Sequence, residues 1–141
     1  MLLNTTFDPH DSSCCQLTYE EPNGWLRATW RGFVDPLEAQ RGAAAYLHYA
    51  AQTPSALLLN DNSQLRGPWF DSFEWLKQVW VPQATSLGLR WVAHVVQADR
   101  HADLLTSQLF LNLPFELQIF QELADAQHWL HQQAKTLNAL N

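Results

Sequence analysis

Residues 56–63 read Ala56-Leu57-Leu58-Leu59-Asn60-Asp61-Asn62-Ser63, a short apolar run followed by a polar cluster. A continuous apolar run of this length is typical of a parallel strand that is covered on both faces. The polar cluster contains residue types that favour turns. We therefore expect a buried strand over 56–59 that ends in a turn at Asn60–Ser63.

Two further strands are expected downstream. Trp91 to Val96 is a second apolar run. Phe115 to Ile119 alternates apolar with polar residues, which predicts a strand with one wetter face.

Helical patterns separate these strands. One helix is expected to begin near 69–71 and to end at Gly88, with Pro82 kinking or dividing it because proline lacks a backbone donor. A short helix is expected over 101–111 and a last one over about 122–135, with the tail 136–141 fraying. Strands that alternate with helices predict right-handed crossovers and a mostly parallel sheet.

The segment before residue 56 differs in character. Residues 15–20 and 26–31 each alternate between apolar and polar, as half-buried strands do. Asn23-Gly24 lies between them and is a strong signal for an antiparallel hairpin. Residues 2–7 are expected to add an edge strand.

A helix is expected to follow this hairpin. Asp35-Pro36 supplies an N-cap followed by proline at the first helical position. The helix should run to about Gln52 and bury one stripe against the sheet. The residues expected on that stripe are Leu37, Ala44, Leu47 and Ala51.

The composition fits one acidic domain. The chain has 141 residues and a formal charge of −6, with eight Lys plus Arg against fourteen Asp plus Glu. Nucleic acids and anionic membranes are poor partners for such a surface, because both require clustered basic residues. Cys14 and Cys15 are adjacent and offer no disulfide framework, and the N-terminal residues do not resemble a signal peptide. A cytoplasmic location is therefore expected.

Several short motifs occur in a characteristic order. They are Trp30-Arg31-Gly32-Phe33, Leu59-Asn60-Asp61-Asn62, Trp75-Leu76, Trp80-Val81-Pro82, Gly88-Leu89-Arg90, Val92-Ala93-His94-Val95-Val96, Ala126 and Trp129-Leu130. Over roughly residues 14–132 this order resembles the SpoIIAA-like, or STAS-like, domains of bacteria, in particular a stand-alone branch that has not been characterised. The resemblance implies a single α/β domain over 1–141. Its mixed sheet would open with the antiparallel hairpin and continue in β-α repeats, with about four helices.

The resemblance also implies a signalling or interaction module that has no catalytic activity and needs no cofactor. In relatives that antagonise anti-sigma factors, a serine in an Asp-Ser-Ser-Gly-like turn is phosphorylated. The matching stretch here contains Asp71-Ser72-Phe73, without the glycine. Ser72 or Ser63 could still be modified, but Ser72 is more simply a residue of the first helical turn.

Polar residues that follow two of the expected strands form a second candidate site. Asn60, Asp61 and Asn62 follow one strand, and Asp99, Arg100 and His101 follow another. The ends of neighbouring parallel strands meet at one edge of a sheet, where ligands bind in many α/β proteins. The two groups would then line a polar pocket or a docking rim. The competing interpretation makes them turn and cap residues.

Histidines and cysteines give little support to a metal site or an enzyme. His94 lies among valines and is expected to be a satisfied interior histidine. His128 and His131 lack a third ligand at metal-binding spacing, and neither cysteine lies in a pattern that would activate a thiol. We expect no catalytic residues. A hydrolase would need a deep polar cleft that holds His94 or His101 beside a carboxylate.

The aromatic helix is the strongest candidate for a functional surface. Phe73, Leu76 and Trp80 share one stripe, whereas Trp75 and Val79 share another. With Trp69, Phe70 and the loop Asn60–Ser63, the second stripe could bind a protein partner or a second copy of the chain.

The alternative function is that the domain binds a small apolar ligand, as lipid-binding relatives of this general fold do. An apolar cavity between the helix and the sheet would favour the ligand. A flat exposed tryptophan patch would favour the partner.

Overall fold

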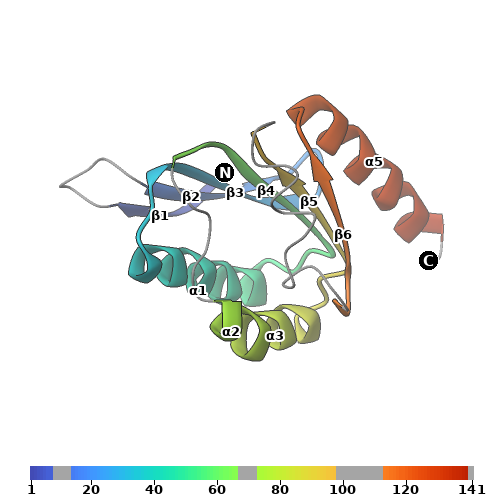
Figure 1. The fold of residues 1–141 in the computed structure, drawn as a ribbon. Helices are drawn as coiled ribbons and strands as arrows, with labels where there is room; N and C mark the ends of the chain where they lie inside the picture. Colours follow the sequence, from blue (N-terminus) through green and yellow to red (C-terminus); the bar gives the residue numbers. More distant parts are fainter. Residues whose placement is uncertain (8–13, 67–72, 98–112, 140–141) are drawn as a thin grey trace.

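The computed structural model describes residues 1–7, 14–66, 73–97 and 113–139. Six strands form one mixed sheet whose spatial order equals their order in the chain (Figure 1). They are β1 (Leu2–Phe7), β2 (Cys14–Glu20), β3 (Trp25–Phe33), β4 (Leu57–Arg66), β5 (Trp91–Val95) and β6 (Glu116–Phe120). Strands β1 to β3 pair antiparallel, and β3 to β6 pair parallel. The expected mixed α/β sheet is therefore confirmed.

The turn between β2 and β3 contains Asn23-Gly24. Gly24 has a φ of 76°, a value that residues with a Cβ rarely adopt. Its amide donates to the carbonyl of Glu20 at 2.8 Å and closes the turn. The glycine thus supplies the backbone conformation that reverses the chain here.

Strand β4 is longer than its apolar run predicts. The expected turn at Asn60–Ser63 is wrong, because these residues lie inside β4, which continues to Arg66. Strand β3 runs on to Phe33 and pairs with β4 along its length, up to Phe33 opposite Arg66. Backbone pairing with this long neighbour outweighs the local turn preference of the Asn-Asp-Asn sequence.

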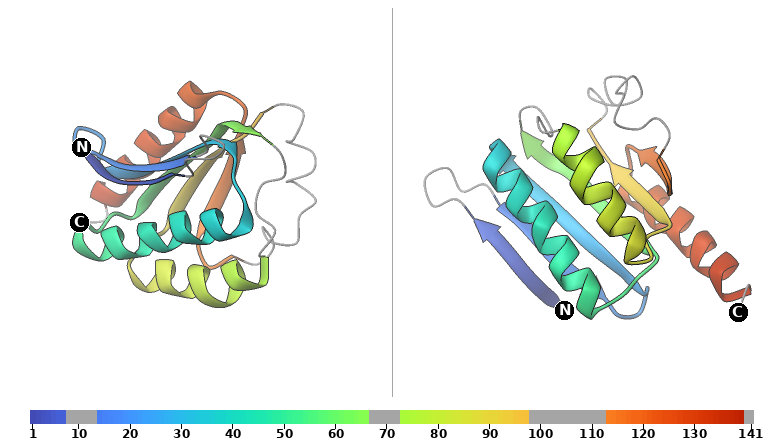
Figure 2. Two further views of the ribbon diagram at one scale, coloured as in Figure 1. Left: turned by 90° about the vertical axis from the view of Figure 1, so that its left-hand side faces the viewer. Right: turned by 90° about the horizontal axis from the view of Figure 1, so that it is seen from below.

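Helices α1 (Pro36–Gln52) and α3 (Val81–Ser86) lie side by side across one face of the sheet, as Figure 2 shows from below. The predicted cap of α1 is confirmed, since the Asp35 carboxylate accepts a hydrogen bond from the Glu38 amide at 2.8 Å. Helix α5 (Leu123–Ala139) covers the opposite face, over β4, β5 and β6. It extends beyond residue 135, where we expected the helix to end.

The buried stripe of α1 differs from the predicted one. Leu37 is 58% exposed, and Ala44 and Ala51 are also exposed. The residues that face the sheet are mostly small: Ala39, Gly42, Ala43, Tyr46 and Ala50. Of the four predicted residues, only Leu47 packs against the core. Small side chains let the helix axis come close to the strands, so the fit to the sheet and not local hydrophobicity decides the buried face.

The segment before Pro82 is a π-helix. Helix α2 (Phe73–Trp75) leads into η1 (Leu76–Trp80), and η1 leads into α3. The Val81 amide bonds to the Leu76 carbonyl, five residues back. An α-helical turn would bring the Pro82 ring against the preceding carbonyls, and the wider π turn relieves this contact.

The described residues contain three helical segments, at 36–52, 73–86 and 123–139, and not the four expected. The helix predicted over 101–111 lies outside the residues described. None of the described helices combines the length and the apolar character that crossing a bilayer requires.

Gly42 allows close packing between α1 and β3, and this makes its substitution informative. A Cβ at Gly42 would lie 2.5 Å from Cη2 and 3.0 Å from Cζ3 of Trp30. We expect Gly42→Ala to lower the free energy of unfolding by about 1 kcal/mol, because overpacking of about 1–3 kcal/mol outweighs a gain in helix propensity of about 1 kcal/mol. Urea titration measures the change.

The matched control is the same substitution in a Trp30→Phe background. Phenylalanine lacks the two clashing carbons, and the nearest remaining atom is the Cβ of Cys15 at 3.2 Å, so the loss caused by Gly42→Ala should be much smaller. An equal loss in both backgrounds would show that Trp30 is not the obstacle.

Candidate functional site

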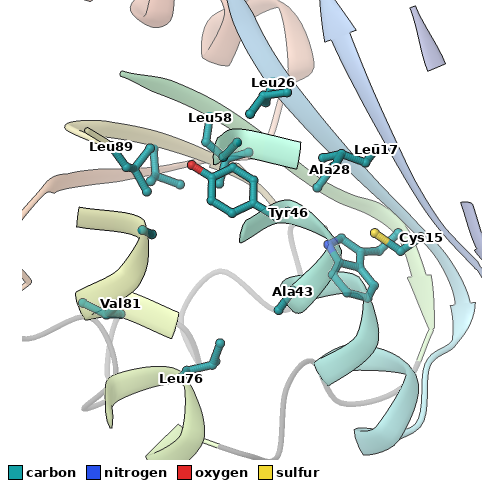
Figure 3. Packing of buried hydrophobic residues seen from close by; sticks show 14 of the residues in the cluster. Cys15, Leu17, Leu26, Ala28, Ala43, Tyr46, Leu58, Leu76, Val81 and Leu89 are labelled. Atoms are coloured by element: carbon teal, nitrogen blue, oxygen red, sulfur yellow. The ribbon is translucent and has the colours of Figure 1, made fainter. Parts of the chain in front are cut away.

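An apolar cavity of about 80 Å³ lies between the sheet and the helices α1, η1 and α3, and it is partly open to solvent. Figure 3 shows the packing around it, with Tyr46 and Ala43 on α1 facing Leu58 on the sheet and Leu76 on η1. The described residues that line it are Ala28, Trp30, Gly42, Ala43, Tyr46, Leu58, Asn60, Leu76, Trp80, Val81, Val92, His94, Leu113, Phe115 and Leu117.

The sheet provides the floor of the cavity through the pleat of three adjacent strands. Side chains two residues apart on a strand point to the same face. Ala28 on β3 pairs with Asn60 on β4, and Asn60 pairs with His94 on β5. The parallel register therefore places the Asn60 and His94 side chains next to each other beneath the helices.

Asn60 connects the polar groups of this floor. Its Oδ1 accepts a hydrogen bond from Trp30 Nε1 at 2.9 Å. Its Nδ2 lies 2.7 Å from His94 Nδ1 and donates to Asn62 Oδ1 at 3.2 Å. An uncompensated carboxamide in an apolar interior costs a few kcal/mol, so these contacts make its burial tolerable.

His94 is a neutral ring in this arrangement. Because an amide nitrogen only donates, His94 Nδ1 accepts and the ring proton lies on Nε2. The ring is 2% exposed. Burial lowers the pKa of His94 to about 4, and the nearby Asp61 charge opposes this shift. His94 is thus an interior histidine, as the sequence predicts, and its Nδ1 is hydrogen-bonded to Asn60.

Aromatic side chains form the helical wall. Trp80 Nε1 donates to the Ala43 carbonyl at 3.0 Å and so links η1 to α1. The ring centroid of Trp80 lies 5.3 Å from that of Tyr46 and 6.3 Å from that of Phe115. The π turn brings Leu76, Trp80 and Val81 to the cavity together.

The four residues Asn60–Ser63 do not form one rim. Asn60 lines the cavity, and the Asn62 side chain that it contacts is 4% exposed. Asp61 instead pairs with Arg27 at 3.0 Å. The Ser63 carbonyl accepts a hydrogen bond from Gln97 at 2.9 Å.

The predicted aromatic stripe is only partly described. Trp75, Val79 and Trp80 are half-buried, and both tryptophans pack against the core on the α1 side. Trp69, Phe70, Ser72, Asp99 and His101 lie outside the described residues. The predictions for these five residues stay predictions.

Sequence reasoning missed the residues that join the two sides of the cavity, above all Tyr46, Gly42 and Trp30. The sequence pattern predicts a strand at Trp30 and a helix at Tyr46, but it gives no indication that both residues line one cavity. One signal did exist. A polar residue follows three leucines at Asn60, and His94 interrupts a run of valines, so two buried strands each carry one polar side chain.

The chemistry available at the cavity is binding through apolar contact. Among its described lining residues there is no Lys, Arg, Asp, Glu, Ser or Cys. Cys15, which lies in the adjoining core, is buried, and burial raises the pKa of its thiol to about 12. Within the described residues no group of His, Cys, Asp and Glu side chains is placed to hold a metal ion.

The fold can be compared with known structures. A crystal structure of an uncharacterised protein of the DUF3478 family, from Shewanella loihica PV-4, superposes on this chain with a TM-score of 0.53. The match covers 89% of this chain and 98% of that one at 16% identity, and that protein is described as having a SpoIIAA-like fold. This chain has a SpoIIAA-like fold. The resemblance in the motif order is confirmed at the level of the fold.

Two other comparisons returned nothing. No protein-family model matches the sequence, and no curated protein matches it significantly. The site of this SpoIIAA-like domain therefore has to be interpreted from its own geometry.

The burial of His94 predicts a loss of stability in mild acid. Its pKa is lower in the folded protein than the ordinary value of 6.5, so the unfolded chain binds the proton more readily. The stabilising contribution is complete above pH 6.5 and falls as the pH drops toward 4. Between pH 7 and pH 5 we expect a loss of about 2 kcal/mol in urea titrations.

Two variants serve as controls for this effect. His94→Gln should remove the pH dependence in that interval, whereas substitution of the exposed His128 by Gln should leave it intact. A wild-type stability that does not change between pH 7 and pH 5 would contradict a neutral, buried His94.

Proposed function

We propose that this SpoIIAA-like domain binds a small apolar molecule, or the apolar end of a larger one, in the cavity between its helices and its sheet. It does so without catalysis. The cavity carries the proposal, because an apolar cavity between the helices and the sheet is the feature that favours a ligand over a protein partner. Its lining is apolar apart from the side chains of Asn60 and His94 and the tips of a few aromatic rings.

The size of the cavity limits what can enter. An engineered apolar cavity of about 150 Å³ binds benzene. This one has about 80 Å³, so it accommodates the end of an alkyl chain or one edge of a ring. Because the cavity is partly open, the rest of a longer molecule would extend toward solvent.

The energetic cost of an empty cavity supports the same function. Protein interiors are usually packed with few voids larger than a water molecule. At about 24 cal/mol per Å³, roughly 2 kcal/mol is the upper bound of the cost for a space of 80 Å³, reached only if all of it were closed to water. A ligand that fills the space recovers part of this free energy on binding.

Filling the cavity from the protein side tests the proposal. In Ala43→Leu an isopropyl group would enter the cavity, while Ala44→Leu makes the same change at an exposed position on α1. In titrations with 2-methyl-1-hexene followed by NMR, the wild type and Ala44→Leu should show shifts at Leu58 and Val92. Ala43→Leu should lose binding at least tenfold while it keeps its stability.

Two outcomes would contradict a ligand site. The first is a wild type that shows no saturable shift with the alkene. The second is equal binding by all three proteins. Mass spectrometry of an organic extract of the purified protein would then identify any natural ligand.

An interaction surface is the second candidate function. Phe33, the last residue of β3, and Leu37, in the first turn of α1, are each 58% exposed. Trp75, the last residue of α2, belongs to the second aromatic stripe that the sequence predicts, and it is half-buried. A self-association surface that includes Trp75 predicts a dimer that Trp75→Ala converts to a monomer with its fold intact.

Light scattering coupled to size exclusion measures this outcome, with circular dichroism as the control for folding. We expect Trp75→Ala to lose about 2–3 kcal/mol of stability in either case, because a large aromatic side chain is removed from the edge of the core. If the wild type and Trp75→Ala are both monomers, Trp75 is a core residue and not part of an association surface.

A further inference from the structure

Tyr46 carries a hydroxyl that borders the cavity. The residue lies on α1, is 3% exposed and lines the cavity. Figure 3 shows its hydroxyl pointing away from α1, toward Leu58 and Leu89. Burial raises the pKa of this hydroxyl. The group is therefore a neutral phenol.

The side chains of Trp30, Asn60 and Trp80 at the cavity already have hydrogen-bond partners. Trp30 donates to Asn60, Asn60 contacts His94 and Asn62, and Trp80 donates to the Ala43 carbonyl. Among the described residues, none forms a hydrogen bond with the Tyr46 hydroxyl. A tyrosine hydroxyl beside an apolar space usually finds a partner, and a group that enters the cavity is in a position to provide one.

We propose that the ligand of this cavity carries a neutral hydrogen-bond acceptor, such as a ketone, aldehyde or ester oxygen, which accepts a hydrogen bond from the Tyr46 hydroxyl. This inference rests on the proposed function. It adds one polar atom, at a defined position, to a ligand that is otherwise apolar.

A carboxylate is the less suitable acceptor. No Lys or Arg is found among the described lining residues. The His94 ring is neutral and its Nδ1 is occupied by Asn60. An ion that enters such a space loses its hydration without gaining a countercharge.

A pair of isosteric probes separates the hydrogen bond from the apolar contact. They are 2-hexanone and 2-methyl-1-hexene, which differ only in a carbonyl oxygen replaced by a methylene group. Both are titrated by NMR into the wild type and into Tyr46→Phe, with hexanoate as the charged probe. Comparing each probe between the two proteins cancels its own hydration.

For 2-hexanone we expect Tyr46→Phe to weaken binding about fivefold, which is the size of one net hydrogen bond. For 2-methyl-1-hexene we expect no weakening. Hexanoate should bind the wild type at least tenfold more weakly than the ketone.

The variant's own stability is a further readout. Because Tyr46→Phe removes a hydroxyl without a described partner, the unliganded variant should be at least as stable as the wild type. A tyrosine that is hydrogen-bonded within the protein would instead lose stability on this substitution, which would overturn the inference.

The failures of the two proposals are distinguishable. If neither isostere binds the wild type, the proposed function fails. If both bind and Tyr46→Phe affects them equally, or affects neither, the domain binds apolar molecules but the role of Tyr46 is wrong. Tighter binding of hexanoate than of the ketone would assign an anionic ligand instead.

Discussion

Asn60 lies in β4, between the parallel strands β3 and β5. Burying its carboxamide there is unfavourable unless the oxygen and the nitrogen both form hydrogen bonds. The Trp30 indole satisfies the oxygen, and the His94 ring and Asn62 accept from the nitrogen. These contacts span β3, β4 and β5, and shifting any one strand by a residue would turn its side chain to the other face. The polar chain therefore holds the register of three strands and, with it, the floor on which the two helices rest. Removing one member would take away a partner from the next, so the members depend on each other.

The helices that lie on this floor leave space for a cavity, and specific sequence features account for it. Helix α1 presents small residues to the sheet, with Gly42 directly against the Trp30 ring. The π turn before Pro82 brings Trp80 toward α1, where the indole reaches the Ala43 carbonyl. A larger residue in place of Ala43 would have filled part of this space. A domain that keeps a void in its main core gives up free energy that a binding function can explain.

Much of the local structure could be predicted from residue patterns. The Asp35-Pro36 cap and the glycine ends at Gly24 and Gly88 depend on neighbours within a few residues, and each lies where it was expected. The effect of Pro82 was foreseen, although the form of the response, a π turn, was not. Two predictions went wrong where distant neighbours decide. The Asn60–Ser63 stretch is drawn into β4 by pairing with β3, and the exposed Leu37 shows that α1 selects its buried face by fit and not by hydrophobicity.

For the candidate site, the sequence by itself determined the ingredients: a polar residue after the leucines of one buried strand, a histidine among the valines of another, and a helix rich in aromatic residues. The mixed α/β sheet and its SpoIIAA-like order of elements could also be predicted, because hydrophobic periodicity and helix caps depend on residues that are close in the sequence. Only the tertiary structure decided that Asn60 and His94 touch, that Asp61 turns to Arg27 on the opposite face, and that Tyr46 brings a lone hydroxyl to an apolar cavity. A cavity is the space left by side chains from several distant elements. Its existence depends on how closely those elements pack, which no single stretch of sequence specifies.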